Sequence, residues 1–306
     1  MSAVHVLYEN EAWMPPLRAA LDARGVRFEE HLTTGGHLDL ASVPPQGVYL
    51  NRMSPSAHTR AHQGGVRMLQ QQLLHLEAHG RRVINGSRAF ALEVSKVAQD
   101  VALRAAGIQT PRTIAVVGGP AALRRAARAM ELPFITKDNQ GGKGLGVRRF
   151  HDLDAFDAYV DSEEFVPGPD GVTLLQAYIQ PPHGFVTRVE IVNGRFLYAL
   201  KSATAGGFEL CPADACALED TFAPREDIGA DDPLVAAYIR MMRANGVDVA
   251  GIEFVEDADG RRYTYDINGT TNYNRDVETA RGLFGMDALA DLAAREAASI
   301  CKGTAA

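Results

Sequence analysis

The sequence lacks any long hydrophobic run. No apolar stretch in its 306 residues approaches the ~18 positions that a transmembrane helix requires, so no membrane contact is expected. The N-terminus has no basic segment ahead of an apolar core, and a secretory signal is therefore not expected either. Cysteine is scarce as well, because Cys211, Cys216 and Cys301 are odd in number and lack metal-ligand spacing. Free thiols and a cytoplasmic location fit this pattern.

Positive charge is also in short supply. The chain has 31 lysines and arginines against 38 acidic residues, which gives a formal net charge of −7. A protein that binds nucleic acid or an anionic membrane along its whole surface usually has the opposite balance. The apolar fraction of 46% and the charged fraction of 23% are ordinary for a globular protein. At ~150 residues per domain, the length predicts about two domains.

Strand and helix patterns alternate in the first third of the chain, which predicts a parallel sheet with crossover helices. We place this first domain at residues 1–94. Its expected strands are 4–8, 26–31, 47–52 and 81–85, and its expected helices are 15–24 and 65–79.

Helix and hairpin patterns follow in the remainder of the chain. We expect one helix from a cap at Ser87 through Ala106, a glycine-rich loop between two strands near 134–150, and a closing helix at 286–301. Asn193-Gly194 between alternating strands predicts a hairpin over 185–201. Residues 205–233, which are rich in acids, show no clear periodicity.

The glycine-rich loop Gln140–Gly146 lies where positive charge gathers. Residues 121–150 hold seven lysines and arginines against two acids, which favours a small polyanionic ligand over a long nucleic acid. Glycines let backbone N–H groups converge on phosphate oxygens, and Lys143 within the loop and Lys137 on the strand before it supply charge. The spacing is not that of a P-loop, and the loop leads into a strand. A plain hairpin turn remains the alternative.

A second hairpin, 249–268, brings acidic residues to one face. With 257–260 as its loop, Glu253 opposes Thr264 and lies diagonal to Asp266. Thr264, Asp266 and Asn268 then share the polar face, whereas Tyr263, Tyr265 and Ile267 share the core face. Two carboxylates and an amide oxygen suit Mg²⁺, and Gly251 on this face would let a ligand approach the backbone. The alternative is that these acids only solvate an exposed sheet.

In this order and spacing, the motifs resemble those of the ATP-grasp ligases, and most closely those of the RimK-type group. The resemblance runs from about Asn85 to Asn268. Its parts are Lys96, FITK with Lys137, QGGKGLGV, LLQAYI at 174–179, Arg188, Glu253, and Asp266 with Asn268. It implies an α/β fold in which a parallel-sheet domain (1–94) precedes two α+β subdomains, 95–172 and 173–306, that hold ATP between them.

The resemblance also implies an ATP site. Its residues would contact the phosphates through lysines and the glycine loop, and the adenine through the strand that follows: Lys96, Lys137, Gly141, Gly142, Lys143, Gly144, Gly146, Gln176, Tyr178 and Ile179. Mg²⁺ or Mn²⁺ would be held by Glu253, Asp266 and Asn268. Arg188 and Lys137 would be catalytic: Lys137 would bind the phosphates, and Arg188 would stabilise charge on the transferred phosphoryl group or on the acyl phosphate.

The implied activity is ligation of a small carboxylate to an amine through an acyl phosphate, with release of ADP and phosphate. A phosphotransferase that stops after phosphoryl transfer is one alternative, and a nucleotide-binding module without catalysis is another. We expect Asn272, Tyr273, Asn274 and Arg275 to contact the substrate, because the segment 270–275 follows Asn268 and departs from the usual family motif. We also expect a contact from Arg52, which follows a strand that ends near Asn51. Arg52 could instead form a surface salt bridge. The sequence leaves both a monomer and a homo-oligomer open.

Overall fold

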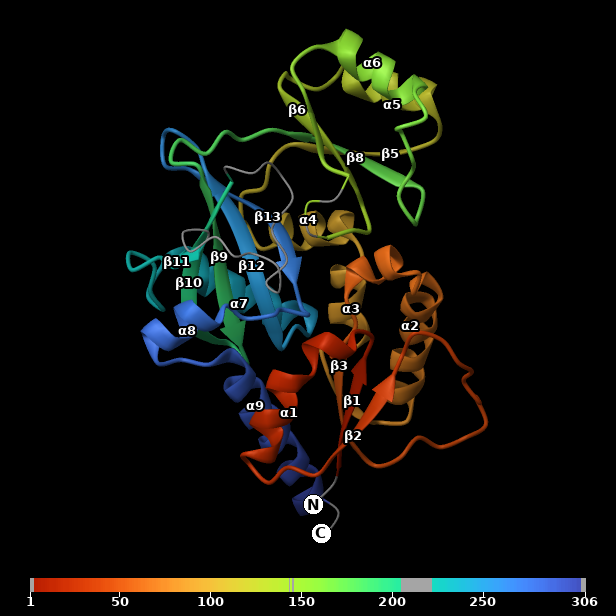
Figure 1. The fold of residues 1–306 in the computed structure, drawn as a ribbon, viewed down its shortest axis with the longest axis vertical. Coiled ribbons are helices and arrows are strands. Elements are labelled where there is room, and N and C mark those ends of the chain that lie inside the picture. The colour runs from red at the N-terminus through yellow and green to blue at the C-terminus, as the bar shows by residue number, and fades with distance from the viewer. Residues whose placement is uncertain (1–2, 143, 145, 205–221, 304–306) are drawn as a thin grey trace.

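Three separate β-sheets organise the protein (Figure 1). The computed structural model describes residues 3–142, 144, 146–204 and 222–303. In Figure 1 the sheet formed by the middle of the chain, coloured yellow to green, stands above the other two. No helix in these described residues is long and apolar enough to cross a membrane.

The first sheet is wholly parallel, which confirms the prediction from the alternating pattern. Its strands run in the order β2–β1–β3–β4. Their bounds are Ala3–Tyr8 (β1), Phe28–Leu32 (β2), Gly47–Arg52 (β3) and Arg82–Ile84 (β4). The carboxyl ends of β1 and β3 therefore meet at one edge, where parallel sheets commonly bind ligands.

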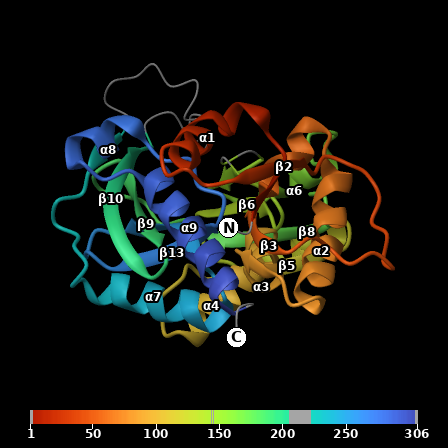
Figure 2. The same ribbon diagram turned by 90° about the horizontal axis from the view of Figure 1, so that it is seen from below.

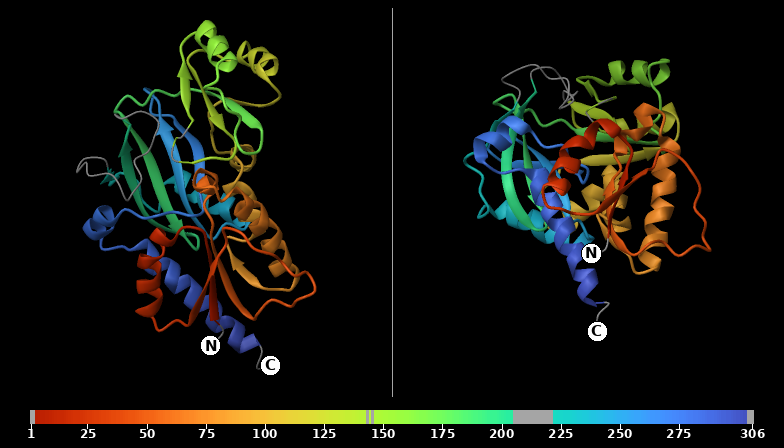
Figure 3. Two further views of the ribbon diagram at one scale, coloured as in Figure 1. Left: turned by 45° about the vertical axis from the view of Figure 1, so that its right-hand side comes forward. Right: turned by 60° about the horizontal axis from the view of Figure 1, so that its bottom comes forward.

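Helices cover both faces of this sheet. One face packs against α2, and the other against α1 and α9. These helices are Pro15–Asp22 (α1), Gln63–Ala78 (α2) and Gly285–Gly303 (α9). The last helix described, α9, therefore lies beside the first strand, β1 (Figure 3). The end of the predicted third domain thus completes the hydrophobic core of the first.

The second sheet is antiparallel, with the order β5–β8–β6–β7, and packs against α5 and α6. The bounds are Thr113–Val117 (β5), Phe134–Asp138 (β6), Arg148–Phe150 (β7), Val172–Ala177 (β8), Pro120–Ala127 (α5) and Leu153–Asp161 (α6). Because β8 pairs with both β5 and β6, the predicted division between 172 and 173 separates this strand from its own sheet.

The third sheet, also antiparallel, has the order β11–β10–β9–β12–β13. Figure 2 shows α7 and α4 side by side on one of its faces, and these helices enclose a core with it. The bounds are Phe185–Val192 (β9), Arg195–Ala203 (β10), Phe222–Pro224 (β11), Val249–Glu256 (β12), Arg262–Asn268 (β13), Lys96–Ala105 (α4) and Pro233–Asn245 (α7). The opposite face of β9, β12 and β13 carries the polar residues of the site.

The predicted single helix from Ser87 through Ala106 is wrong. Two helices occupy this region, α3 (Ser87–Glu93) and α4, with a break at Val94 and Ser95. The Ser95 side chain accepts a hydrogen bond from the backbone N–H of Ala98 and so caps α4. The break puts Lys96 in the first turn of α4, beside the third sheet.

The hairpin of β12 and β13 forms as predicted, but its register differs. Glu253 lies directly opposite Asp266, and Thr264 pairs with Phe254 instead of Glu253. The pairing shifts between these positions, so Tyr265 is the extra residue of a β-bulge. Thr264 consequently faces the core. Tyr265, which strict alternation assigned to the core face, reaches the polar face.

Sequence patterns did not indicate several short elements. These are β5, β11, two 3-10 helices, η1 (Glu11–Trp13) and η2 (Pro55–Arg60), and α8 (Arg275–Arg281). Most of them have only one or two turns or three to five strand residues, so they carry too little periodicity to be recognised.

Candidate active site

A cleft of about 810 Å³ opens where the three sheets meet. The polar face of β9, β12 and β13 forms one wall, and the β6–β7 loop and the end of β8 form the opposite wall. The first domain contributes Trp13 and the start of η2, Ser54 to Ser56. The volume of the cleft lies within the ~300–1,000 Å³ that is typical of small-ligand sites.

A row of charged side chains crosses the wall of the third sheet. The register places Arg188 of β9 beside Glu253 of β12, and Glu253 beside Asp266 of β13. Arg188 donates hydrogen bonds from Nη1 to Glu253 (3.1 Å) and from Nε to Glu190 (2.7 Å). Its Nη2 bonds the hydroxyl of Thr271. Three partners therefore fix the guanidinium in a partly buried position at the cleft.

Gly251 provides the space that this guanidinium occupies. A Cβ at position 251 would lie 2.5 Å from Nε and Nη2 of Arg188, closer than atoms can approach. We expected this glycine to admit a ligand to the backbone. In the structure it admits the Arg188 side chain, so a larger residue there would displace the arginine.

Two lysines lie beside Asp266. Nζ of Lys96 bonds Oδ1 of Asp266 at 2.5 Å, and Lys137 lies with its Nζ 5.9 Å from the ring centre of Tyr265. Burial alone would raise the pKa of Asp266, but the charges of Lys96 and Lys137 outweigh it and hold that pKa below its usual range. Burial, together with the charge of Lys96, lowers the pKa of Lys137 to about 7.

The donors on β12 and β13 fit a hard divalent cation. Glu253 and Asp266 offer carboxylates from paired positions, and Asn268 follows two residues later on the same face. Burial raises the pKa of Glu253, although the charge of Arg188 opposes this shift. Tyr265 donates to Oε2 of Glu253 at 3.0 Å and orients it. Carboxylate and amide oxygens are the ligands that Mg²⁺ and Mn²⁺ prefer.

The opposite wall holds the predicted adenine strand and the glycine loop. Gln176, Tyr178 and Ile179 at the end of β8 all line the cleft. The side chain of Gln176 donates to Thr113 at 2.8 Å, and the guanidinium of Arg149 lies 4.7 Å from the ring centre of Tyr178. These contacts place the backbone that follows β8 along the cleft.

The loop between β6 and β7 leads into a strand, as predicted. Gly141, Gly142 and Gly144 line the cleft, whereas Gly146 is not among the described residues that line it. Gly144 and Gly146 have φ of +70° and +72°, values that favour glycine. Lys143, the predicted charge within this loop, lies outside the described residues.

The predicted substrate contacts divide into two groups. Asn272 and Asn274 line the cleft, although Asn274 also caps α8 by accepting from the N–H of Val277. Tyr273 packs against two of the hydrophobic cores. Arg275 is exposed at the start of α8 and is not among the described residues that line the cleft.

Arg52 is buried, which excludes the surface salt bridge considered as an alternative. The residue is only 4% exposed, and its guanidinium donates to the carbonyl of Thr271 (3.0 Å) and to Oδ1 of Asn272 (3.1 Å). Arg52 therefore holds the 270–275 segment from behind, and Asn272 is the residue of this pair that lines the cleft.

Sequence reasoning missed two buried acids of the cleft. Glu190 accepts from Arg188 and from the hydroxyl of Thr271, and its place two residues after Arg188 on β9 was the available signal. Glu93 accepts from the backbone N–H groups of Gly269 and Thr270. Burial raises the pKa of Glu93 to about 7. Nothing in the sequence near residue 93 indicated this contact, which depends on the break between α3 and α4.

The chain resembles a curated protein in sequence and several solved structures in fold. No family model matches the chain. D-alanine–D-alanine ligase A from Mesorhizobium japonicum is 28% identical over 202 residues, which are 60% of this chain and 53% of that protein. The chain thus spans about half the length of the curated relative that it matches.

Two solved structures cover nearly the whole chain. The RimK domain ATP-grasp protein from Sphaerobacter thermophilus is 19% identical with a TM-score of 0.70, over 96% of this chain and 99% of that one. The ATP-grasp ligase PsnB, in complex with a phosphomimetic variant of its minimal precursor, Mg and ADP, is 18% identical with a TM-score of 0.66, over 97% and 99%. The chain therefore has the ATP-grasp fold, in the form found in RimK-domain proteins.

Proposed function

We propose that the protein is an ATP-dependent carboxylate–amine ligase. The observation that carries this proposal is the row of Arg188, Glu253 and Asp266, with Lys96 and Lys137 close to Asp266, in a cleft that is bounded by a glycine-rich loop. Cations for phosphates and oxygen donors for a metal are thus combined in one cleft. This combination suits phosphoryl transfer, in which positioning and electrostatics supply most of the catalysis.

Each residue has a physical role in this reaction. A carboxylate is a poor electrophile, so transfer of the γ-phosphoryl group to it would form an acyl phosphate that an amine can attack, with ADP and then phosphate leaving. Lys96 and Lys137 would bind the phosphates, and Arg188 would stabilise negative charge on the transferred group. The loop that contains Gly141 and Gly142 would keep water away from the intermediate.

The metal proposed for Glu253, Asp266 and Asn268 is Mg²⁺ or Mn²⁺. When bound, it would neutralise charge on the phosphates. Lys96 bonds Asp266 in this structure, so the same lysine would turn from the carboxylate to a phosphate when Mg·ATP binds. The adenine would lie along the backbone of Tyr178 and Ile179.

The proposed partners are ATP, a small carboxylate and an amine. The two comparison enzymes differ in this respect, since one is named for the joining of D-alanines and the other is bound to a precursor. The acceptor in this protein is therefore proposed only as an amine on a small molecule or a peptide.

The direct test is a screen of acid and amine pairs with Mg·ATP. We expect ADP release that requires both partners, and an amide identified by mass spectrometry. A stable phosphorylated acid without amide would favour the phosphotransferase alternative. Absence of Mg·ATP binding by calorimetry at millimolar concentrations would contradict any nucleotide-dependent function.

We expect the affinity for Mg·ATP to weaken as the pH rises above 7. Lys137 has a pKa of about 7, so above that pH it would have to gain a proton when phosphates bind. The Kd for Mg·ATP should therefore rise by up to ~10-fold per pH unit between about pH 7 and pH 9. Calorimetry across this range measures the slope. Lys137→Arg keeps its charge throughout, and its slope should be flat. If the affinity for Mg·ATP changes with pH equally in both proteins, Lys137 does not bind the phosphates.

We expect Asn272→Ala to raise KM for a non-nucleotide substrate by ~10-fold, the effect of one lost polar contact, and to leave KM for ATP within about threefold. Steady-state kinetics with each substrate varied in turn measure both constants. Arg275→Ala, outside the cleft, is the control and should change neither. If Asn272→Ala raises both KM values equally, Asn272 supports the local structure of residues 270–275 and does not bind the substrate.

A further inference from the structure

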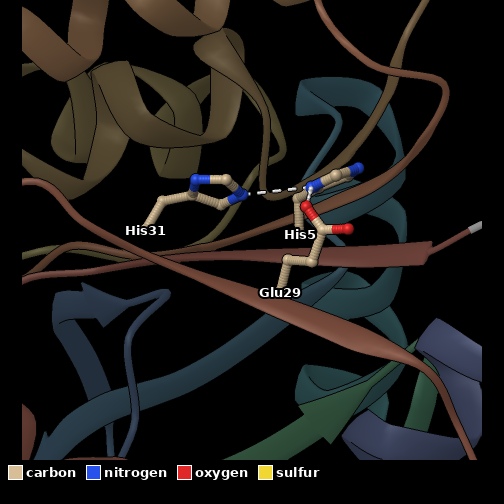
Figure 4. Close-up of side chains that lie close together, drawn as sticks. All are labelled: His5, Glu29 and His31. Atoms are coloured by element: carbon tan, nitrogen blue, oxygen red, sulfur yellow. Dashed lines mark hydrogen bonds and ion pairs between the residues drawn. The ribbon is translucent and has the colours of Figure 1, made fainter.

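Three side chains of the kinds that bind metals, two histidines and a glutamate, lie close together on the first sheet (Figure 4). His5 of β1 lies beside Glu29 of β2, and the same register places Leu7 beside His31. Residues two apart on a strand share a face, so His5, Glu29 and His31 all project to the same side of this parallel pair. None of the three is among the described residues that line the cleft.

Their ligand atoms already have spacings close to those of a metal site. Nδ1 of His5 is 3.0 Å from Nε2 of His31 and 3.6 Å from Oε2 of Glu29, and the three ligand atoms lie within 4.8 Å of one another. In a tetrahedral Zn²⁺ site with bonds of ~2.0–2.2 Å, neighbouring ligand atoms are ~3.3–3.6 Å apart. Small side-chain rotations would therefore admit an ion.

One ligand is rigid and the other two can adjust. His5 is 1% exposed, and its ring stacks on that of Tyr49 with centroids 4.5 Å apart. A Cβ at Gly47 would lie 2.8 Å from Nε2 of His5, so the absence of a side chain there lets the ring lie against β3. Glu29 is exposed and His31 half-buried, because β2 is the edge strand. Solvent on that side can supply a further ligand.

We propose that His5, Glu29 and His31 form a binding site for a divalent transition metal, with Zn²⁺ as the best fit. Two imidazole nitrogens and one carboxylate oxygen suit Zn²⁺, whereas Mg²⁺ prefers oxygen ligands alone. The ion would tie the exposed edge strand β2 to β1. This site is separate from the one proposed for Glu253 and Asp266 in both position and ligand type.

Calorimetry with Zn²⁺ on the metal-free, untagged protein under reducing conditions tests the site, and visible absorption with Co²⁺ reports its geometry. We expect His31→Ala to weaken Zn²⁺ binding at this site by at least ~100-fold, since even partners that only orient a ligand contribute 10–100-fold. Glu29→Gln, which preserves size, should also weaken it, and both variants should lose the rise in Tm that Zn²⁺ gives the parent protein.

His75→Ala is the matched control. His75 of α2 and His79, the C-cap residue of that helix, form a second histidine pair with ring centroids 4.6 Å apart and could take up Zn²⁺ independently. This variant should keep the Zn²⁺ affinity and the Tm shift of the parent protein. If His31→Ala and Glu29→Gln bind Zn²⁺ as the parent does, or the parent binds none at micromolar concentrations, the cluster is only a hydrogen-bonded pair of histidines beside an acid, and the proposal fails.

Discussion

Asp266→Asn is expected to lower ADP release by about 10³-fold and to leave the fold intact. Asp266 is both a proposed metal ligand and the partner of Lys96, so its charge positions two groups that act on the phosphates. A loss of ~4 kcal/mol in transition-state stabilisation corresponds to this factor and is within the range that metal-ion catalysis supplies. Steady-state turnover, together with circular dichroism, measures both expectations.

Asp259→Asn is the matched control for this change. Asp259 lies in the loop of the same hairpin, with its side chain 68% exposed, and forms a surface ion pair with Arg261. Its replacement should leave turnover unchanged, because exposed ion pairs contribute little. Near-normal turnover in Asp266→Asn would show that the β12–β13 hairpin is not part of the catalytic centre.

Arg188→Lys should reduce kcat by ~10²–10³-fold with a smaller change in KM for ATP. A lysine retains the positive charge between Glu190 and Glu253 but cannot reproduce the three directed hydrogen bonds of the guanidinium. Loss of one group that stabilises transition-state charge has a cost of this size. Single-turnover measurements of ADP formation separate this step from binding.

Arg195→Lys, on the neighbouring strand β10, controls for arginine-to-lysine exchange at an exposed position. It should leave both constants unchanged. If Arg188→Lys instead raises KM for ATP with kcat preserved, Arg188 acts in binding alone, and its proposed role on the transferred group is wrong.

The sequence predicted most elements of the fold because their patterns are local. The parallel first sheet, the hairpins predicted over 185–201 and 249–268, and the helix α2 all have the periodicity or turn residues that mark such elements. The return of α9 to the first sheet was not predictable in this way, because it depends on packing between residues nearly 300 positions apart.

The sequence indicated which residues would lie together in the cleft better than it indicated how they would be arranged. Glu253, Asp266 and Lys96 meet as the motifs indicated, but strict alternation could not reveal the bulge at Tyr265 that places the two acids directly opposite each other. Local patterns also gave no sign that Arg52 would be buried behind Asn272, because both of its partners lie more than 200 positions away. Pairings of this kind arise only from tertiary structure.

The transfer of ¹⁸O from a labelled carboxylate tests the central claim most directly. The acid identified by the screen is labelled in its carboxylate oxygens and incubated with the amine and Mg·ATP, and the released phosphate is analysed by mass spectrometry. An acyl phosphate intermediate requires that one carboxylate oxygen leaves with the phosphate, so we predict one ¹⁸O in each phosphate released. Unlabelled phosphate, formed together with the amide, would contradict activation of the carboxylate by phosphorylation.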